Sequence, residues 1–274
     1  MLAAAVVAVC AMLPAYSNPD PFSDGVAKDE VSAASGCSAP LTGIGGHGFN
    51  YCGDHWRLSK LPVRFRLNPS GTPSTVASNL ALAADLAAAA WDSASPVSGG
   101  GPRPNRCTAA TRIICVEALD HSAVVNPTDG KNVIVWQNLG AAAAPAYADI
   151  RLSGHRIEDV DIVLNGSLSW YWDDAALVAT GVALGPVAPF CPRFACPLRY
   201  DLQAILTHEF GHALGLLHVN PGSPAVWPSD LTDAPDYNLV MYPVYYPNNA
   251  TWRVLGWGDL AGLNVAMRVS ASDP

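Results

Sequence analysis

Cationic side chains are scarce in this sequence and are not clustered. Acidic residues outnumber basic residues 23 to 15, which gives a formal net charge of −8, and only three of the basic residues are lysine. Nucleic acids and anionic membrane surfaces are bound through clusters of Lys and Arg. The composition therefore excludes both as main partners of this protein.

The N-terminal apolar run is too short to cross a membrane. Residues 2–13 are apolar, whereas a membrane-spanning helix needs about 20 residues. Ala15, Tyr16 and Ser17 then provide the small-x-small pattern that signal peptidase cleaves. We therefore expect residues 1–17 to be a signal peptide, with no stable membrane insertion of the mature protein and a secreted, extracellular or periplasmic location.

Cysteine pairs of the Cys-x-x-Cys type, which are typical of thiolate zinc sites, are absent. Loss of the signal peptide removes Cys10 and leaves an even number of cysteines, which predicts three disulfides in a secreted chain. These cysteines are Cys37, Cys52, Cys107, Cys115, Cys191 and Cys196. They allow 15 connectivities, among which pairing between sequence neighbours (37–52, 107–115 and 191–196) closes three short loops.

No internal repeat divides the 274 residues. Residues 18–54 are rich in Ser, Gly, Ala and Asp and show no periodicity, so we expect an N-terminal extension or a short pro-segment there. The remaining chain, residues 55–274, has a length that allows one large domain or two small ones.

The hydrophobic pattern predicts strands and helices in mixed order. Residues 61–68 alternate apolar and polar side chains, as in a strand. Thr72 and Pro73 then resemble the N-cap and first position of a helix that reaches Trp91. Further strands are expected at residues 112–117, 131–137 and 159–164. With a second helix near residue 200, this order predicts an α/β (α+β) fold with a twisted mixed sheet packed against helices.

Residues 208–218 read HEFGHALGLLH and carry three histidines with the spacing of a metal site. The apolar pattern around them predicts a helix with Asp201 as its N-cap. His208 and His212 are four positions apart, so both imidazoles project from one face of the helix. They can therefore reach one zinc ion at ~2.0–2.1 Å.

Glu209 and Gly215 complete this pattern. Glu209 projects about 100° round the helix from His208, where it can deprotonate a water that the zinc activates. If the helix continued, His218 would lie about 9 Å beyond His212 along the axis and could not share the ion. Gly215 tolerates a left-handed conformation, so we expect the helix to end and the chain to turn, which makes His218 the third ligand.

The extended motif H-E-x-x-H-x-x-G-x-x-H resembles that of the metzincin zinc endopeptidases. Residues 239–243, LVMYP, look like the Met-turn of the matrixins, the matrix metalloprotease family. Residues 161–170 are similar to the strand and turn that precede the matrixin active-site helix, and residues 258–263 resemble the start of its C-terminal helix. Residues 56–68 resemble the opening strand of secreted bacterial members, so the likeness covers roughly residues 55–268.

This resemblance implies that residues 55–274 form a single domain with a metzincin-like fold, which has an active-site helix, a backing helix and a C-terminal helix. It implies a monomeric zinc-dependent endopeptidase that acts on protein or peptide substrates, with Glu209 as general base. It also implies structural calcium (Ca²⁺), although no loop of spaced carboxylates is evident in the sequence. The substrate is expected to lie along an edge strand within residues 140–151.

The resemblance further assigns residues around the substrate. Met241 is expected to form an apolar floor beneath the zinc, and Ala204 to lie at the base of the S1′ pocket. The small Ala204 side chain would leave a deep pocket for a large apolar P1′ residue. One wall of this pocket is assigned to Pro243, Val244 and Tyr245.

Some features depart from the matrixin pattern. His218 and Met241 are 23 positions apart, which is a longer connection than in animal matrixins, and residues 171–200 form another insertion. There is no counterpart of the Pro-Arg-Cys-Gly pro-segment, so latency through a cysteine–zinc bond is not expected. Four histidines lack the family's structural-zinc spacing and are interpreted as ordinary surface or core residues: His47, His55, His121 and His155.

Two other functions are compatible with the zinc pattern. One is a secreted zinc-binding or adhesion module with little or no turnover, although a site that only binds metal has no use for Glu209. The other is a hydrolase of a sugar or of a non-peptide amide, which the likeness to the Met-turn disfavours. Replacement of Glu209 by Ala separates these classes, because a hydrolase would lose turnover and keep its zinc.

Overall fold

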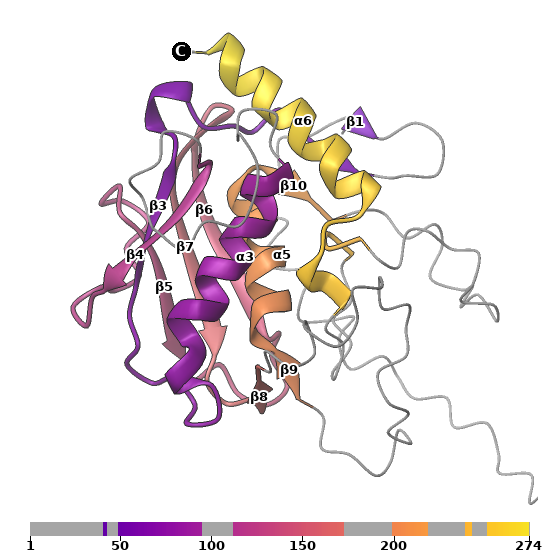
Figure 1. Cartoon of the computed structure of the whole chain (residues 1–274). Helices are drawn as coiled ribbons and strands as arrows, with labels where there is room; N and C mark the ends of the chain where they lie inside the picture. The colour runs from indigo at the N-terminus through magenta and orange to yellow at the C-terminus, as the bar shows by residue number, and fades with distance from the viewer. Residues whose placement is uncertain are drawn as a thin grey trace, which may run out of the picture.

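The computed structural model describes residues 41–42, 49–94, 112–172, 199–218, 239–242 and 251–273. In this part of the chain no helix is both long and apolar enough to cross a membrane. The strands are β1 (Leu41–Thr42), β2 (Asn50–Tyr51), β3 (Val63–Leu67), β4 (Ile114–Leu119), β5 (Asn132–Gln137), β6 (Ala146–Ser153), β7 (Arg156–Asn165), β8 (Trp170–Tyr171), β9 (Tyr200–Asp201) and β10 (Leu216–Leu217). The α-helices are α3 (Leu80–Ala94), α5 (Leu202–Ala213) and α6 (Trp257–Ser272), and the short 3-10 helices are η1 (Leu58–Lys60), η2 (Ala77–Asn79) and η4 (Thr251–Arg253) (Figure 1).

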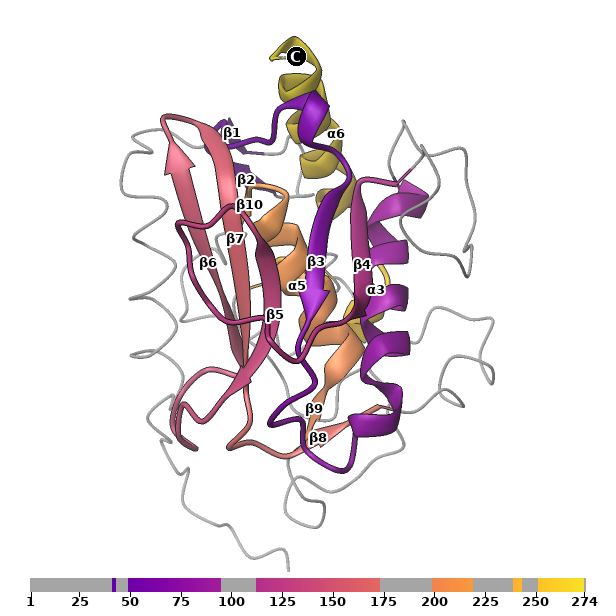
Figure 2. The same cartoon turned by 90° about the vertical axis from the view of Figure 1, so that its left-hand side faces the viewer.

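Five strands form one twisted sheet in the order β4-β3-β5-β7-β6 (Figure 2). Strand β3 pairs in parallel with β4 and β5, and β5 pairs in parallel with β7. Strand β6 is antiparallel to β7 and lies at one edge of the sheet. The described residues therefore form a mixed α/β fold with a mixed sheet and three α-helices, which confirms the predicted fold class at this level.

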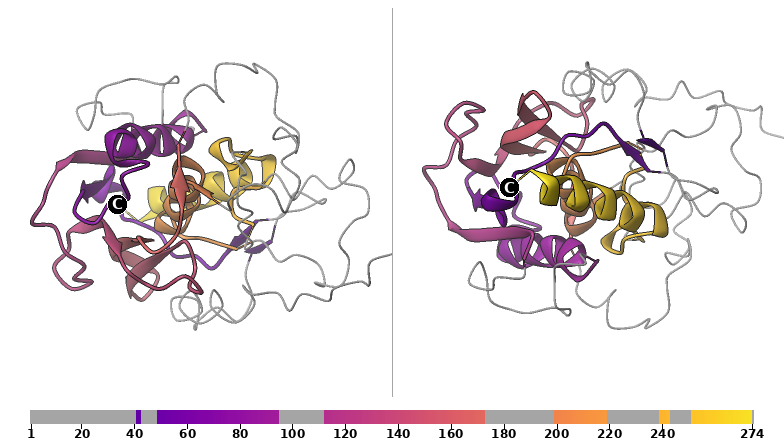
Figure 3. Two further views of the ribbon diagram at one scale, coloured as in Figure 1. Left: turned by 90° about the horizontal axis from the view of Figure 1, so that it is seen from below. Right: turned by 90° about the horizontal axis from the view of Figure 1, so that it is seen from above.

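The helices α3 and α5 pack against each other on one face of the sheet (Figure 2). The indole Nε1–H of Trp91, on α3, donates a hydrogen bond of 2.8 Å to the carbonyl of Thr207, on α5. Helix α6 runs beside β2 and β10, near the C-terminal end of α5 (Figure 3). Helix α3 thus contacts α5, and α6 contacts β10, the two elements of the segment that carries the histidine motif.

Side-chain alternation along β5 and β7 divides the apolar residues into two clusters. Ile134 and Ile162 point toward the helices and belong to the main core. Val133 and Val163 point to the opposite face and pack with Ala123, from the segment before β5. Both faces of these strands are buried, which explains why their sequences are almost continuously apolar.

The four predicted strands are confirmed by β3, β4, β5 and β7, which overlap residues 61–68, 112–117, 131–137 and 159–164. The predicted start of the first helix is wrong. The Thr72 hydroxyl donates to the carbonyl of Pro69 at 2.6 Å and closes a turn, whereas an N-cap hydroxyl accepts from a helical N–H. Residues 74–79 form another turn and η2, so that α3 begins only at Leu80.

The predicted signal peptide, residues 1–17, lies outside the described residues. Residues 49–54, which the sequence assigns to the extension, pack into the fold, and Tyr51 is fully buried there. Cys52 and Cys115 each take part in a disulfide. The other cysteines lie outside the described residues, so the pairing stays a prediction.

Candidate metal centre

Helix α5 is buried along its whole length, since all twelve of its residues are shielded from solvent. The carboxylate of Asp201 accepts a hydrogen bond of 2.8 Å from the amide of Ala204, which confirms the predicted N-cap. The same carboxylate forms a bidentate ion pair with Arg253, with Nε–Oδ1 at 2.9 Å and Nη2–Oδ2 at 2.5 Å. Both charged side chains are buried, so the pair attaches the start of α5 to η4.

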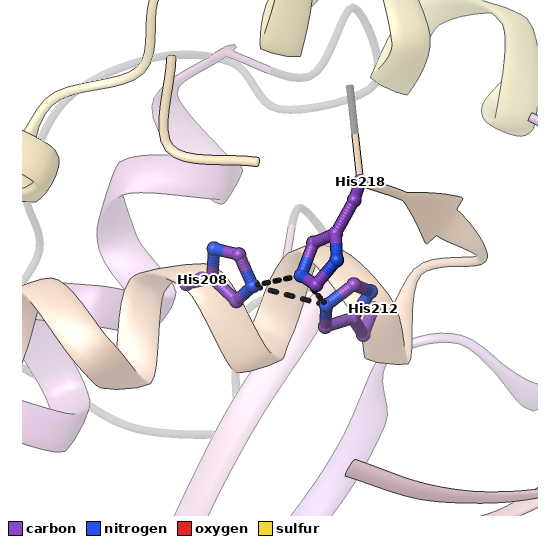
Figure 4. A group of neighbouring side chains, drawn as sticks. All are labelled: His208, His212 and His218. Carbon is purple, nitrogen blue, oxygen red and sulfur yellow. Dashed lines mark hydrogen bonds between the residues drawn. The ribbon is translucent and has the colours of Figure 1, made fainter. Parts of the chain in front are cut away.

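Three histidine side chains converge at the C-terminal half of α5 (Figure 4). His208 and His212 project from one face of the helix, and Gly215, at φ +89°, turns the chain into β10. His218 follows β10 and points back toward the other two rings. The Nε2 atom of His208 lies 3.0 Å from that of His212 and 3.0 Å from that of His218, and the third separation is 3.2 Å. The structure thus brings the three predicted ligands together through the predicted turn.

Hydrogen bonds on the far side of two rings fix which nitrogens face the centre. Nδ1 of His208 lies 2.5 Å from the carbonyl oxygen of Val240. Nδ1 of His212 lies 2.8 Å from the carbonyl oxygen of Leu216. A carbonyl oxygen only accepts, so each Nδ1 carries a proton, and in a neutral ring Nε2 then holds the lone pair. Lone pairs that face each other at 3.0 Å repel unless a cation lies between them.

The spacing of the three nitrogens fits zinc. Tetrahedral coordination at ~2.0–2.1 Å places two ligand nitrogens about 3.3 Å apart, and the observed separations are 3.0–3.2 Å. A zinc-ligating imidazole also usually donates its other ring N–H to a carboxylate, a backbone carbonyl or a water, as the Nδ1–H groups of His208 and His212 do here. Within the described ranges this is the one group of His, Cys, Asp and Glu side chains arranged to hold an ion. The residues present can therefore bind one metal ion, and the expected structural calcium stays a prediction.

Glu209 is fully buried directly after the first ligand. Helix geometry directs its side chain about 100° from His208, beside the ligands rather than among them. Trp252, on η4, is 1% exposed, and the centroid of its ring lies 6.5 Å from that of the His208 ring. This side of the histidine cluster is therefore lined by an aromatic ring. A buried carboxylate beside converging imidazoles is a candidate general base.

Met241 packs directly on α5 at Gly211. A Cβ added at Gly211 would overlap the Met241 thioether and come within 2.8 Å of the Trp91 ring. The glycine inside the histidine motif therefore makes room for Met241, which is 2% exposed. The preceding residue, Val240, supplies the carbonyl that orients His208. The segment 239–242 is thus part of the support of the first ligand.

Asp259, at the start of α6, holds this segment in place, and sequence reasoning missed it. Its carboxylate accepts hydrogen bonds from the amides of Val240 (2.9 Å) and Met241 (3.1 Å), and from the amide of Gly256 (2.8 Å). Burial raises the pKa of Asp259 to about 6, against the opposing effect of these amides. The available signal was an acidic residue in the first turn of an expected helix, a position that caps helices.

Of the predicted pocket residues, only Ala204 lies within the part of the chain that the structure describes. Ala204 is 1% exposed and lies one turn before His208 on α5. The predicted wall residues Pro243, Val244 and Tyr245 lie outside the described residues. The same holds for most of the two insertions in the chain, residues 219–238 and 173–198.

The other described histidines take no part in the metal centre. His55 is bonded through Nε2 to the carboxylate of Asp273 at 3.2 Å. His155 is bonded to the carboxylate of Asp54 at 2.9 Å and is largely exposed. His121 is exposed as well, which agrees with their interpretation as ordinary histidines, and His47 lies outside the described ranges.

Neither a scan against protein-family models nor a search of curated proteins gives a match to this chain.

Proposed function

We propose that this protein is a secreted zinc-dependent endopeptidase, similar to the matrixins among the metzincins. The observation that carries the proposal is the convergence of the Nε2 atoms of His208, His212 and His218 within 3.2 Å of one another. Two of these ligands and the buried Glu209 belong to one helix, so the ligands and a base are held in one rigid unit.

The remaining architecture supports the same proposal. Helix α5 would be the active-site helix, α3 the backing helix and α6 the C-terminal helix, all beside a mixed sheet. Met241 packs against α5 next to the ligands, as expected for the floor of a metzincin site. Asp259 attaches this floor to α6 through two backbone amides.

The chemistry follows from the groups around the ligands. A bound zinc ion would polarise the scissile carbonyl and lower the pKa of a water to near 7. His208 and His212 would hold it through Nε2, because their Nδ1 protons are engaged by backbone carbonyls. Glu209 would accept the proton of the attacking water and pass it to the leaving amine. No serine or cysteine nucleophile is needed in such a reaction.

The substrate would pair with β6. This strand lies at the sheet edge, contacts α5 and overlaps the predicted stretch 140–151. An edge strand offers unpaired main-chain groups to an extended peptide, which gives affinity that does not depend on side chains. We assign selectivity to the small Ala204, which would accept a large apolar P1′ residue.

Digestion of casein, with and without 1,10-phenanthroline, tests the proposal. We expect cleavage that the chelator abolishes. The variant Glu209→Gln should lose about 10²- to 10⁴-fold in rate while its zinc content stays at the wild-type value, because it lacks only the base. Glu158→Gln, on β7 and partly exposed, is the matched control and should cleave like the wild type.

Chelator-resistant cleavage, or a Glu209→Gln variant as fast as the control, would contradict the proposal. A zinc-loaded wild type that cleaves neither casein nor a random peptide library would favour the zinc-binding or adhesion module instead. The same peptide library reports the P1′ preference, and an absence of preference for large apolar residues would remove the role assigned to Ala204.

A further inference from the structure

The third ligand, His218, is not held by the helix that carries the other two. Six positions separate it from His212, and the turn at Gly215 and the two-residue strand β10 lie between them. A strand of two residues is not stable without partners. The position of His218 therefore depends on whatever packs against this connection.

Residues 49–56, here called the N-terminal strap, contact the connection at each step. The Nε1–H of Trp56 donates a hydrogen bond of 2.7 Å to the carbonyl of Ala213, at the end of α5. The carbonyl of Asp54 lies against Gly215, where an added Cβ would overlap it. Strand β2, in the strap, pairs antiparallel with β10. The strap thus covers the helix end, the turn and the strand in order.

Asn50 extends this support to the ligand itself. Its Nδ2 donates a hydrogen bond of 2.6 Å to the carbonyl oxygen of His218, and the side chain is buried. Leu216, which pairs with Tyr51 of the strap, supplies the carbonyl that accepts from Nδ1 of His212. Two of the three ligands are therefore oriented by β10, which is held by the strap.

We propose that Asn50 is a positioning residue for the third metal ligand, His218, and that the metal centre needs the N-terminal strap to hold this ligand in place. This inference rests on the proposed metal site. Partners of ligands in the outer shell set metal affinity, and their loss typically weakens binding 10- to 100-fold. It follows that any cleavage that matures the chain must leave residues 49–56 attached.

Metal binding, rather than activity, tests this inference. Asn50→Leu keeps the shape and neutrality of the side chain and removes the donor. We expect it to bind Zn²⁺ 10- to 100-fold more weakly in competition with a chromophoric chelator, and to change the visible spectrum of the Co²⁺-substituted protein. Asn50→Gln restores an amide donor and should lose less affinity than Asn50→Leu.

The matched control is Asn264→Leu, on α6. It removes an amide hydrogen bond of similar length, from Nδ2 to the carbonyl of Leu260 within the same helix at 2.9 Å, and should bind Zn²⁺ like the wild type, because this bond does not reach any of the three histidines. Urea unfolding of the zinc-free variants separates loss of affinity from loss of fold.

Three outcomes overturn the inference. The first is an Asn50→Leu variant that binds Zn²⁺ within twofold of the wild type. The second is an Asn50→Gln variant that loses as much affinity as Asn50→Leu at equal stability, and the third is a control that loses as much as Asn50→Leu. A wild type that binds no Zn²⁺ would instead overturn the proposed metal site, and this inference with it.

Discussion

Replacement of Gly215 by Ala perturbs the turn that brings the third ligand to the other two. The residue has φ +89°, and a Cβ there would overlap the carbonyl oxygen of Asp54. The left-handed backbone alone costs an alanine about 1–2 kcal/mol, and the alanine recovers about 0.4–1 kcal/mol through the unfolded chain. Overpacking against a backbone group adds about 1–3 kcal/mol, because the strap cannot give way like a flexible side chain.

Gly140→Ala isolates the contribution of the contact. Gly140 has φ +92° and no heavy atom within 4 Å of a Cβ built on it, so it carries the same backbone cost without the overlap. We therefore expect Gly215→Ala to lower the free energy of unfolding by about 1–3 kcal/mol more than Gly140→Ala does. Zinc affinity should fall only in Gly215→Ala, because only that variant displaces the segment leading to His218.

Urea denaturation of the zinc-free proteins, followed by a zinc titration of each, makes the comparison. Equal stabilities of the two variants, within about 0.5 kcal/mol, would refute the assigned contact between Gly215 and the strap. Wild-type zinc affinity in Gly215→Ala would refute the link between this turn and the third ligand.

Two further predictions concern buried charges. Arg253→Met leaves the carboxylate of Asp201 buried without its cation, so the free energy of unfolding should fall by about 3–5 kcal/mol in urea denaturation. The double variant with Asp201→Asn should recover most of this loss, and a single variant as stable as the wild type would count against the ion pair. Burial raises the pKa of Asp161 to about 7, above its value of about 3.9 in an unfolded chain. Because the folded state binds this proton more tightly, the protein loses stability as pH rises from about 4 to about 7. Asp161→Asn should flatten that slope in unfolding curves collected across the window, and an unchanged slope would contradict the assignment.

Local pattern was enough to predict most of α5 and its ligands. The N-cap at Asp201, the spacing of His208 and His212 and the left-handed Gly215 are each decided within a few residues of sequence. Alternation of apolar and polar residues predicted β3, and the hydrophobic pattern of residues 131–137 and 159–164 predicted β5 and β7, since the sheet selects apolar residues on its buried faces. The predicted N-cap at Thr72 was wrong because a threonine hydroxyl can donate or accept a hydrogen bond, and the sequence does not say which it does here.

The supports of the metal centre could not be predicted in this way, because they are distant in sequence. Asn50 bonds to the main chain of His218, a predicted ligand 168 positions further along the chain, and it lies in a segment with no periodicity. Asp259 binds amides 18 and 19 positions before it. Contacts of this kind depend on how the elements pack, and a single sequence carries no local signal for them.

The burial of α5 has a consequence for how a metal ion bound by the three histidines would be released. Amide hydrogen exchange in a fully buried helix follows global unfolding, whereas a two-residue strand that pairs with only one other described strand, the equally short β2, can open locally. We therefore expect His208 and His212 to belong to the slowest-exchanging unit of the fold, and His218 to a faster one. The dissociation rate of the ion would then be set by how often residues 214–218 detach, and not by the stability of the helix that carries most of the motif.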